Sequence, residues 1–487
     1  MSPTPDSSSS GAASTGTAST GPATGARPTL AALAGQLEGT VVLPGDVGWD
    51  DARTAWNLAV DQQPSAVAFP RSVRDLRQII ATAAAGGLGV TAQPRGHSPS
   101  DGLTGQILVR TSAFDEITVN VVGRFARVGA GVPWGTLLNR LNGSGLIALA
   151  GTNPDVSVAG YLLSGGHSWF SRWKGLAAHS IRAVELVDAS GVLRRVTRES
   201  DADLLWALRG AAGLFGVVTT LEIDLYPAAE LFGGKLLFPA ESAEVVLEAA
   251  VEVLLDAPPE LSLFLGLINM PDVEQVPEML RGRSFTQVDA VFVGSAEAGE
   301  ALLAPLLSIA PVIANFTRPF PIGELGDVSA EPQEPSAALD WGTAVTELDS
   351  ATIAALVGAF HTASYAGLTL IQLRPLGGLI GDAGHGADGV VGHLDAGFLL
   401  FAAAVLPPGA PAPSEADSHL LFQPLEDTLQ AVSIQRSVPS LLTTGQDLSH
   451  AFEPAALQRL AEIKRRVDPG NLFRSNHPLP AGNDDQT

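Results

Sequence analysis

The chain has 487 residues, of which 46% are hydrophobic and 16% charged, so it is long enough for two or three compact units with sizeable cores. Acidic residues outnumber basic ones by 51 to 28, and the formal net charge of −23 argues against nucleic acid or an anionic membrane as a partner. There is no cysteine, which excludes disulfides, thiolate metal sites and any cysteinyl cofactor linkage.

The first 29 residues are rich in Ser, Thr, Ala, Gly and Pro, with neither a basic start nor an apolar block. We expect a disordered tail here rather than an export signal, and hence a cytoplasmic protein. No apolar run reaches the roughly 18 residues of a membrane span without a Pro, a Gly or a charge. The nine histidines form no HExxH or HxxxH pair, so no metal site is predicted.

The first strongly periodic segment begins at a capping box, Ser72 to Asp75, and we predict a helix from there to Gly86-Gly87. A short strand, Val90 to Gln93, follows and leads directly into a polar turn, Pro94 to Ser98. Further strands are predicted at Ile107 to Arg110, Ile117 to Val121 and Phe125 to Val128, and a helix at Val132 to Leu141.

The segment Gly151 to Gly175, GTNPDVSVAGYLLSGGHSWFSRWKG, is rich in glycine and carries three ring side chains, Tyr161, His167 and Trp169. Glycines let the backbone approach a bulky ligand, so this segment is a candidate cradle for a phosphate or a flat ring. A plain glycine-rich connector is the alternative, because glycine motifs alone are hypotheses.

Next we predict a hairpin, Ile181 to Val187 with Val192 to Val196, and a helix capped by Ser200 with Asp203 that runs through Arg209. Gly210 to Gly216 then leads into a buried strand, Val217 to Leu225, which is rich in β-branched residues.

From Ala228 to about Ser433, predicted strands alternate with Ala-rich helices, and the loop Asp327 to Ser336 is assigned to the surface. A last helix follows Pro454. The strands are Leu261 to Ile268, Phe285 to Phe292, Leu368 to Leu373 and Phe398 to Val405, and the clearest helix is Ser242 to Leu255. The expected division is a tail (1–29), a first domain (30–227), a second domain (228–433), a segment returning to the first domain (434–480) and a tail (481–487).

Four separated motifs resemble those of the FAD-linked oxidases of the vanillyl-alcohol oxidase and p-cresol methylhydroxylase superfamily, most closely the berberine-bridge-enzyme-like branch. They are QPRGHS (93–98), GTNPDVSVAGYLLSGGHSW (151–169), WALRGAAGLFGVVT (206–219) and KRRVDPGNLF (464–473). The resemblance implies an α+β fold. An FAD-binding domain of two α+β subdomains would be followed by a substrate domain with an antiparallel sheet covered by helices.

The resemblance also implies where FAD would lie. His97 matches the histidine that bonds covalently to the flavin, and the turn around it would face the pyrophosphate. The expected cofactor-binding residues are Gln93, Pro94, Arg95, Gly96, His97, Ser98, Thr152, Asn153, Asp155, Val156, Gly160, Tyr161, Gly165, Gly166, Gly216, Val218, Asn471 and Phe473.

The chain departs from the family pattern in three places. Many relatives have a cysteine where Asn153 stands, and without it the flavin linkage is expected to be single. Ala211, Ala212 and Leu214 interrupt a run of glycines, which would reshape the pocket for the adenine or pyrophosphate. The C-terminal region SVPSLLTTGQDLSHAF has no tyrosine, so the base that relatives use on the substrate is missing.

The leading hypothesis is therefore an oxidase that takes a hydride from an alcohol or activated C–H centre of a bulky organic molecule, possibly a secondary metabolite, and reduces dioxygen to hydrogen peroxide. His167 and Tyr161 are the candidate catalytic residues; packing against the flavin is the alternative role for His167. A flavin-dependent oxygenase or non-redox cyclase, or a catalytically silent flavoprotein, remain alternatives. The protein is expected to be a monomer or homodimer.

Gln372 and Arg374 form a polar pair on one predicted strand. Because alternate residues of a strand share a face, the two side chains could point together into a substrate cavity. The alternative is a solvated face of the sheet.

Overall fold

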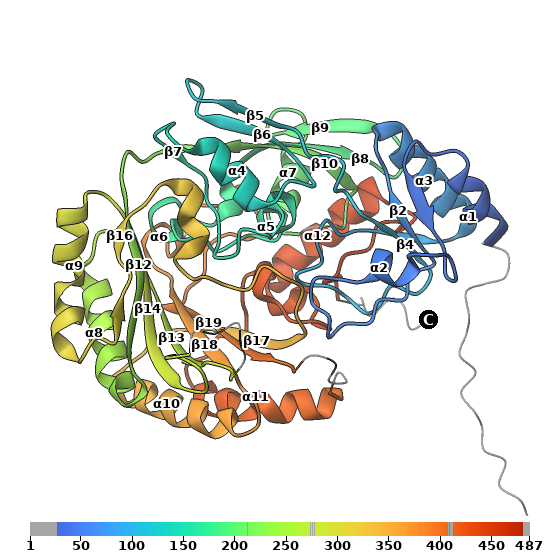
Figure 1. Ribbon diagram of the computed structural model, residues 1–487. Helices are drawn as coiled ribbons and strands as arrows, with labels where there is room; N and C mark the ends of the chain where they lie inside the picture. The colour runs from blue at the N-terminus through green and yellow to red at the C-terminus, as the bar shows by residue number, and fades with distance from the viewer. Residues whose placement is uncertain are drawn as a thin grey trace, which may run out of the picture.

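The computed structural model describes residues 27–480 except 212, 273, 275, 277, 383, 408 and 410–412. Most of the expected N-terminal tail, the C-terminal tail and Ala212 lie outside this described part. The predicted α+β class is confirmed: the strands form sheets of four, five, two and eight strands with helices packed on them (Figure 1).

The four-stranded sheet has the order β1-β2-β4-β3, in which β2 and β3 each run parallel to β4. Its helix α3 begins after Ser72, whose side chain accepts a hydrogen bond from the Asp75 N–H. The other half of the predicted capping box is wrong, because the Asp75 carboxylate accepts from Glu38, Gly39 and Arg71 N–H groups instead. The elements are α1 (Arg27–Ala34), β1 (Thr40–Val42), α2 (Trp49–Arg53), β2 (Ala66–Phe69), α3 (Val73–Gly86), β3 (Gly89–Ala92) and β4 (Gln106–Val109).

The five-stranded sheet has the order β5-β6-β10-β8-β9, and all its neighbours are antiparallel. Helix α7 begins one residue later than predicted, because Asp201 rather than Ser200 caps it by accepting from the Leu204 N–H. The elements here are β5 (Ile117–Asn120), β6 (Phe125–Gly129), α4 (Trp134–Leu141), β7 (Leu146–Ile147), α5 (Val158–Leu163), α6 (Ser171–Lys174), η1 (Ala177–Ser180), β8 (Ile181–Val187), β9 (Leu193–Thr197), α7 (Ala202–Leu208), β10 (Val217–Asp224) and β11 (Tyr226–Pro227).

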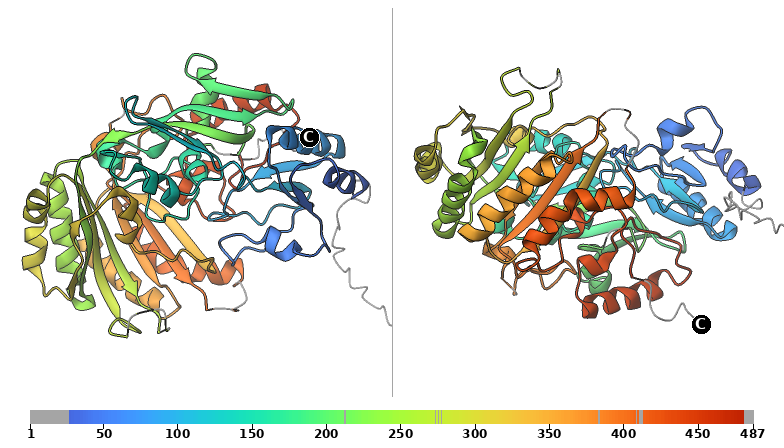
Figure 2. Two further views of the ribbon diagram at one scale, coloured as in Figure 1. Left: turned by 45° about the horizontal axis from the view of Figure 1, so that its top comes forward. Right: turned by 90° about the horizontal axis from the view of Figure 1, so that it is seen from below.

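The eight-stranded sheet forms the second half of the molecule, with the order β15-β12-β14-β13-β18-β19-β17 and β16 paired to β12. All the pairs are antiparallel, and helices α8 to α11 cover the outer face (Figures 1 and 2). The strands are β12 (Leu231–Pro239), β13 (Leu261–Asn269), β14 (Ser284–Val293), β15 (Ala314–Asn315), β16 (Arg318–Pro319), β17 (Ala338–Val345), β18 (Leu370–Pro375) and β19 (Phe398–Val405). The helices are η2 (Ala240–Ser242), α8 (Ala243–Asp256), α9 (Ala296–Ile309), η3 (Ile322–Asp327), α10 (Ser350–Ser364), η4 (Gly378–Ile380) and α11 (Glu415–Leu429).

The two faces of this sheet differ in what they contact. Alternate residues such as Leu265, Ile371 and Leu400 pack in a core with the outer helices. The residues between them, such as Phe264 and Leu399, belong instead to the core of the first half of the chain. The inner face of the eight-stranded sheet therefore lies against the first half, which is where a site between the two halves can form.

The C-terminal segment packs on the N-terminal sheet, with η5 (Pro439–Leu441), η6 (Leu448–His450) and α12 (Pro454–Val467) preceding its last turn. Val90 donates its N–H to the Leu472 carbonyl and accepts from the Arg474 N–H, so the last residues extend the edge of β3. In both views of Figure 2 the red C-terminal helix lies beside green elements of the first half.

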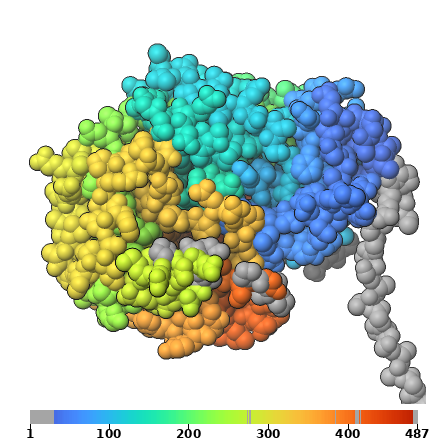
Figure 3. All heavy atoms as spheres, viewed as in Figure 1, coloured from blue at the N-terminus to red at the C-terminus, as the bar shows by residue number. Residues whose placement is uncertain are grey.

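The loop between η3 and β17, predicted to be a surface loop, joins the two halves. The Trp56 ring N–H donates to the Gln333 carbonyl, and Asn57 bonds to the backbone of Ala338. Figure 3 shows this gold segment lying against the blue N-terminal part. In the part of the chain that the structure describes, no helix has the length and apolar character that crossing a bilayer requires.

Candidate functional site

The turn after β3 places His97 between an aromatic ring and a carboxylate. Its imidazole stacks on Trp56, with 4.4 Å between ring centroids and 21° between planes. Its Nε2 lies 3.6 Å from an Asp155 carboxylate oxygen, while Arg95 contacts the other oxygen of Asp155 at 3.0 Å. The Nε2 atom is enclosed and has no hydrogen-bond partner among the described residues. The imidazole ring is thus held in orientation, while its Nε2 atom has no hydrogen-bond partner among the described residues.

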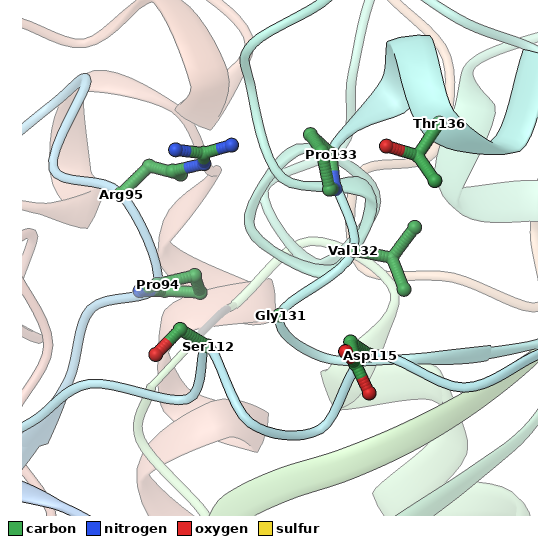
Figure 4. A pocket seen from close by; sticks show the side chains of 8 residues that line it. All are labelled: Pro94, Arg95, Ser112, Asp115, Gly131, Val132, Pro133 and Thr136. Carbon is green, nitrogen blue, oxygen red and sulfur yellow. The ribbon is translucent and has the colours of Figure 1, made fainter.

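Two hollows flank Arg95. One, of about 370 Å³, is lined by Pro94 and Arg95 on one side and by the turn from Gly131 to Thr136 on the other (Figure 4). The second, of about 460 Å³, is lined by Trp56, Arg95 and Asp155 together with residues 333–335 of the joining loop. In Figure 4 the Arg95 side chain extends across the first hollow toward Pro133. Both volumes lie in the range of small-molecule sites.

Gly96 in this turn has a φ of +86°, and a Cβ there would lie 3.0 Å from the Ala55 Cβ. Glycine is therefore required both by the backbone conformation and by the space. Gln93, which precedes the turn, is buried, and its side-chain oxygen accepts from Arg110 at 2.7 Å. The Gln93 side chain is thus engaged in holding the turn, with its cofactor role still a prediction.

The glycine-rich segment contains α5 and carries most of the other residues predicted to bind the cofactor. Asn153 caps a turn by accepting from the Asp155 N–H, and its amide donates to the Pro332 carbonyl of the joining loop. Gly160 donates its N–H to Ser157 at the start of α5. Thr152 is buried and Val156 partly buried beside them, while Ser98 is exposed at the end of the turn.

Tyr161 is enclosed by glycines. A Cβ on Gly151 would lie 2.9 Å from the ring, and one on Gly166, whose φ is +66°, would lie 2.5 Å from it. The ring meets Trp134 edge to face, and its hydroxyl has no partner among described atoms. Burial, the largest effect, raises the pKa of Tyr161, so the phenol stays protonated. Gly165 has a φ of +91° and borders Val391 instead.

Gly166→Ala should therefore destabilise the protein by about 2–4 kcal/mol, the sum of a left-handed backbone penalty and overpacking against Tyr161. Gly143→Ala is the matched control, because Gly143 also has a positive φ of +74° but no described atom within 4 Å. It should cost about 1–2 kcal/mol. Urea denaturation of both variants measures the difference. Equal losses of stability in the two variants would show that the Tyr161 ring shifts to make room for the new methyl group.

His167 is buried at 1% exposure where the two halves meet. Its Nε2 lies 3.1 Å from the Pro375 carbonyl, and since a carbonyl only accepts, Nε2 carries the proton. The Nδ1 lone pair has no partner in the described part of the chain. Burial and, secondly, the charge of Arg374 lower the pKa of His167 to about 3. The imidazole is therefore a neutral hydrogen-bond acceptor at pH 7.

This depressed pKa makes stability depend on pH. Between pH 3 and 6.5 the native state binds fewer protons at His167 than the unfolded state does, so the free energy of unfolding falls as the pH is lowered. At pH 5 the expected contribution is about 2 kcal/mol. Urea titrations at pH 7 and pH 5 measure this effect. Between these two pH values the free energy of unfolding should fall by about 2 kcal/mol less in His167→Gln than in the wild type. Identical losses would contradict the assignment.

The polar pair on β18 is buried, so the alternative of a solvated face is wrong. Gln372 and Arg374 are 5% and 7% exposed and lie on the inner face of the sheet. Arg374 donates from Nε to the Gln372 oxygen at 2.8 Å and lies over the ring of Phe264. Asp340 of β17 is on the same face, and burial raises its pKa to about 6. A carboxyl group with a pKa in that range is suited to proton transfer.

Four of the residues predicted to bind FAD lie in the core, in a strand or in a turn, and each has a role in the fold itself. Gly216 has a φ of +158° and is packed against Leu186 and Val187. Val218 is a buried residue of β10. Asn471 is an exposed turn residue with a φ of +47°, and Phe473 is in the core beneath the N-terminal sheet. Their assignment to FAD remains a prediction.

Three residues of the site escaped the sequence analysis. Trp56 and Arg110 belong to no motif, and they reach the turn around His97 only through the fold. Asp340 lies in a stretch without clear strand periodicity. Its one signal is that it is an acidic residue next to Trp341 in an otherwise uncharged stretch, SAALDWGTAV, which is suggestive only once the strand is known.

Two segments of the chain match known families. Residues 64–197 match the FAD binding domain family, and residues 450–480 match the berberine and berberine-like family. The chain is 26% identical over 466 residues to the (R)-6-hydroxynicotine oxidase of Paenarthrobacter nicotinovorans, covering 91% of this chain and 97% of that one. It is 31% identical over 189 residues to the glucooligosaccharide oxidase of Sarocladium strictum, covering 38% of each.

Two further comparisons concern an oxygenase and the fold. A monooxygenase of Fusarium proliferatum, described as FAD-dependent, is 30% identical over 238 residues, and the chain spans 45% of its length. The solved structure of BBE-like 1 from Physcomitrella patens superposes with a TM-score of 0.79 at 20% identity, covering 93% of this chain and 99% of that one. At that identity the likeness shows the fold alone.

Proposed function

This chain belongs to the berberine-bridge-enzyme-like FAD-linked oxidases of the vanillyl-alcohol oxidase and p-cresol methylhydroxylase superfamily, and on that premise we propose how its site works. It is a flavin oxidoreductase that oxidises a bulky organic molecule. The proposal adds a single covalent link to FAD through His97, hydride removal from an alcohol or activated C–H centre, and dioxygen as the electron acceptor.

The observation that carries this proposal is the enclosed, unpartnered Nε2 of His97 beside the two hollows at Arg95. A buried ring nitrogen without a partner is costly unless a ligand uses that space or the nitrogen itself reacts. Asp155 and Trp56 would orient the imidazole, and Arg95 supplies positive charge for the pyrophosphate. The residues therefore fit FAD. With no cysteine in the chain, no second thioether link can form.

FAD, when bound, supplies the hydride acceptor and then returns the electrons to dioxygen. The protein groups have to bind and orient the substrate and move one proton. The neutral Nδ1 of His167 can accept a hydrogen bond from the substrate, and Tyr161 can donate one from its protonated hydroxyl. Asp340 is the candidate acceptor of the proton, because it lies on the same face of the sheet as Arg374 and its pKa of about 6 leaves it largely ionised at neutral pH yet basic enough to accept.

Steady-state assays with secondary alcohols and amines, including hydroxynicotine and oligosaccharides, on which relatives act by name, test the reaction. We expect dioxygen consumption and hydrogen peroxide formation in equal amounts with at least one substrate. Reduction of the flavin without peroxide formation would exclude an oxidase.

An oxygenase or a non-redox cyclase is the second candidate, because the C-terminal region has no tyrosine and two relatives are named monooxygenases. Labelled dioxygen distinguishes them: label in the organic product indicates oxygenation, and a product isomeric with the substrate indicates cyclisation. A flavin that no donor reduces would indicate a catalytically silent flavoprotein.

A further inference from the structure

Arg374 differs from the other buried arginines in how little it is bonded. Four arginines are buried in the described part of the chain, and three of them are saturated by oxygen atoms of the fold. Arg110 donates to two backbone carbonyls of α2 and its flank and to Gln93, and Arg172 donates to three carbonyls. Arg209 binds backbone carbonyls and the Asp388 carboxylate. These three guanidinium groups therefore have structural roles.

Arg374, by contrast, makes one hydrogen bond, from Nε to Gln372. No carboxylate of the described residues lies within ion-pair distance of it. The carboxylate that acts most strongly on the pKa of Arg374 is Glu331 of the joining loop, which raises it without forming an ion pair among the described residues. Asp289, the cross-strand partner of Phe264, acts less, at about two strands and so roughly 10 Å away. Asp289 is itself neutralised by Lys235 at 2.8 Å and bonded by Ser329. A buried charge without a directly bonded counter-charge is costly, so Arg374 is suited to a ligand that brings one.

The surroundings of Arg374 define the shape of that ligand. The rings of Phe264 and Phe401 lie 5.2 and 5.8 Å from the guanidinium carbon. Trp169 stacks on Phe264 at 3.9 Å. The charge of Arg374 acts on the pKa of both Tyr161 and His167, each of which has an unpartnered polar atom. A positive group and aromatic walls thus lie together between the two halves, and the charge of the positive group reaches the Tyr161 hydroxyl.

We propose that Arg374 and the Tyr161 hydroxyl bind a carboxylate of the substrate, so that the substrate class is a planar organic acid. This inference rests on the oxidase function proposed above and specifies its substrate. A guanidinium receives a carboxylate through two parallel N–H donors, and the terminal nitrogens of Arg374 have no described partner that would prevent this. A neutral carbonyl of the flavin ring would leave the charge of Arg374 uncompensated, so we favour the substrate as the source of the anion.

The test measures ligand binding to the flavin-loaded protein through changes in flavin absorbance. Three acids, benzoate, phenylacetate and cinnamate, are each compared with the corresponding amide, which has the same shape without the charge. At least one acid should bind the wild type roughly 10- to 100-fold more tightly than its amide, as expected for a charge-assisted hydrogen-bonded pair. In Arg374→Gln this preference should vanish, whereas Arg374→Lys should retain part of it. Arg182→Gln, at a partly exposed site, is the control.

Three outcomes would overturn the proposal. One is that none of the acids binds the wild type better than its amide. Another is that Arg374→Gln retains the preference. The third is that Arg374→Gln shifts the reduction potential of the ligand-free flavin while acids and amides bind alike, which would assign Arg374 to the flavin itself. If Arg374→Gln does not fold, Arg374→Lys provides the comparison. Failure of the oxidase function is distinguishable, because then the purified protein lacks either flavin absorbance or substrate-dependent reduction.

Discussion

His97→Ala should abolish the covalent attachment of FAD. Acid-precipitated wild-type protein should remain yellow and fluorescent, whereas the precipitated variant should be colourless, with all its FAD in the supernatant. The physical reason is that the His97 imidazole lies against Trp56 and Asp155, which line the second hollow, and that the chain has no cysteine to form a second link. Absorbance of pellet and supernatant, with mass spectrometry of the peptide containing His97, measures the effect.

His419→Ala is the matched control for this experiment, because His419 is a largely exposed histidine on α11. It should retain the full amount of bound flavin. Free FAD in the supernatant of the precipitated wild type would contradict the covalent link. Flavin retained by the His97→Ala pellet would mean that another residue forms the bond.

Lys464→Met should destabilise the protein by about 3–5 kcal/mol, because it leaves a buried carboxylate without its counter-charge. Lys464 and Asp468 are 7% and 1% exposed, and their charged atoms lie 2.5 Å apart. The ammonium also donates to the carbonyls of Leu214 and Phe473. It therefore joins α12 to the turn before β10 and to the last residues of the chain that pair with β3. Guanidinium denaturation at pH 7 measures the loss.

Arg74→Met provides the comparison, because the Arg74–Glu38 pair is 70% and 55% exposed. An exposed pair contributes at most about 1 kcal/mol. Lys464→Met combined with Asp468→Asn should recover part of the lost stability, since no buried charge is then left alone. A Lys464→Met variant as stable as Arg74→Met would show that water reaches Asp468.

The local elements were predictable where short-range chemistry determines them. The sequence from Ser72 to Gly87 contains a cap, an apolar stripe and a glycine stop, and α3 has nearly those bounds. The strands β13, β14 and β19 were predicted within one residue at each end, because β13 and β19 are mainly apolar and β14 is rich in β-branched and aromatic residues. The cap of α7 was misassigned, since Ser200 and Asp201 are both good caps and only the backbone conformation selects between them.

The candidate site was predictable in part. The motif around His97 located the turn, and the glycine-rich segment contains Tyr161, which is partly buried, and His167, which is buried. Whether Arg374 faces a cavity or solvent could not be predicted, because an alternating strand pattern does not reveal which face of the sheet is covered. The joining loop was assigned to the surface, where residues 332–335 are indeed exposed, but its backbone contacts with Trp56 and Asn153 could not be predicted from its composition.

The amino-acid sequence by itself determined the family motifs, the absence of any thiol and the local elements that present His97, because these depend on residue type and on neighbours within a few positions. Only the tertiary structure decided that Arg374 is buried without an ion pair to any described carboxylate, that Asp340 shares its face and that Trp56 stacks on His97. Those facts arise from contacts between residues far apart in the sequence, such as Trp56 with His97 and Phe264 with Arg374. Such contacts depend on how the sheets pack, which no local pattern encodes.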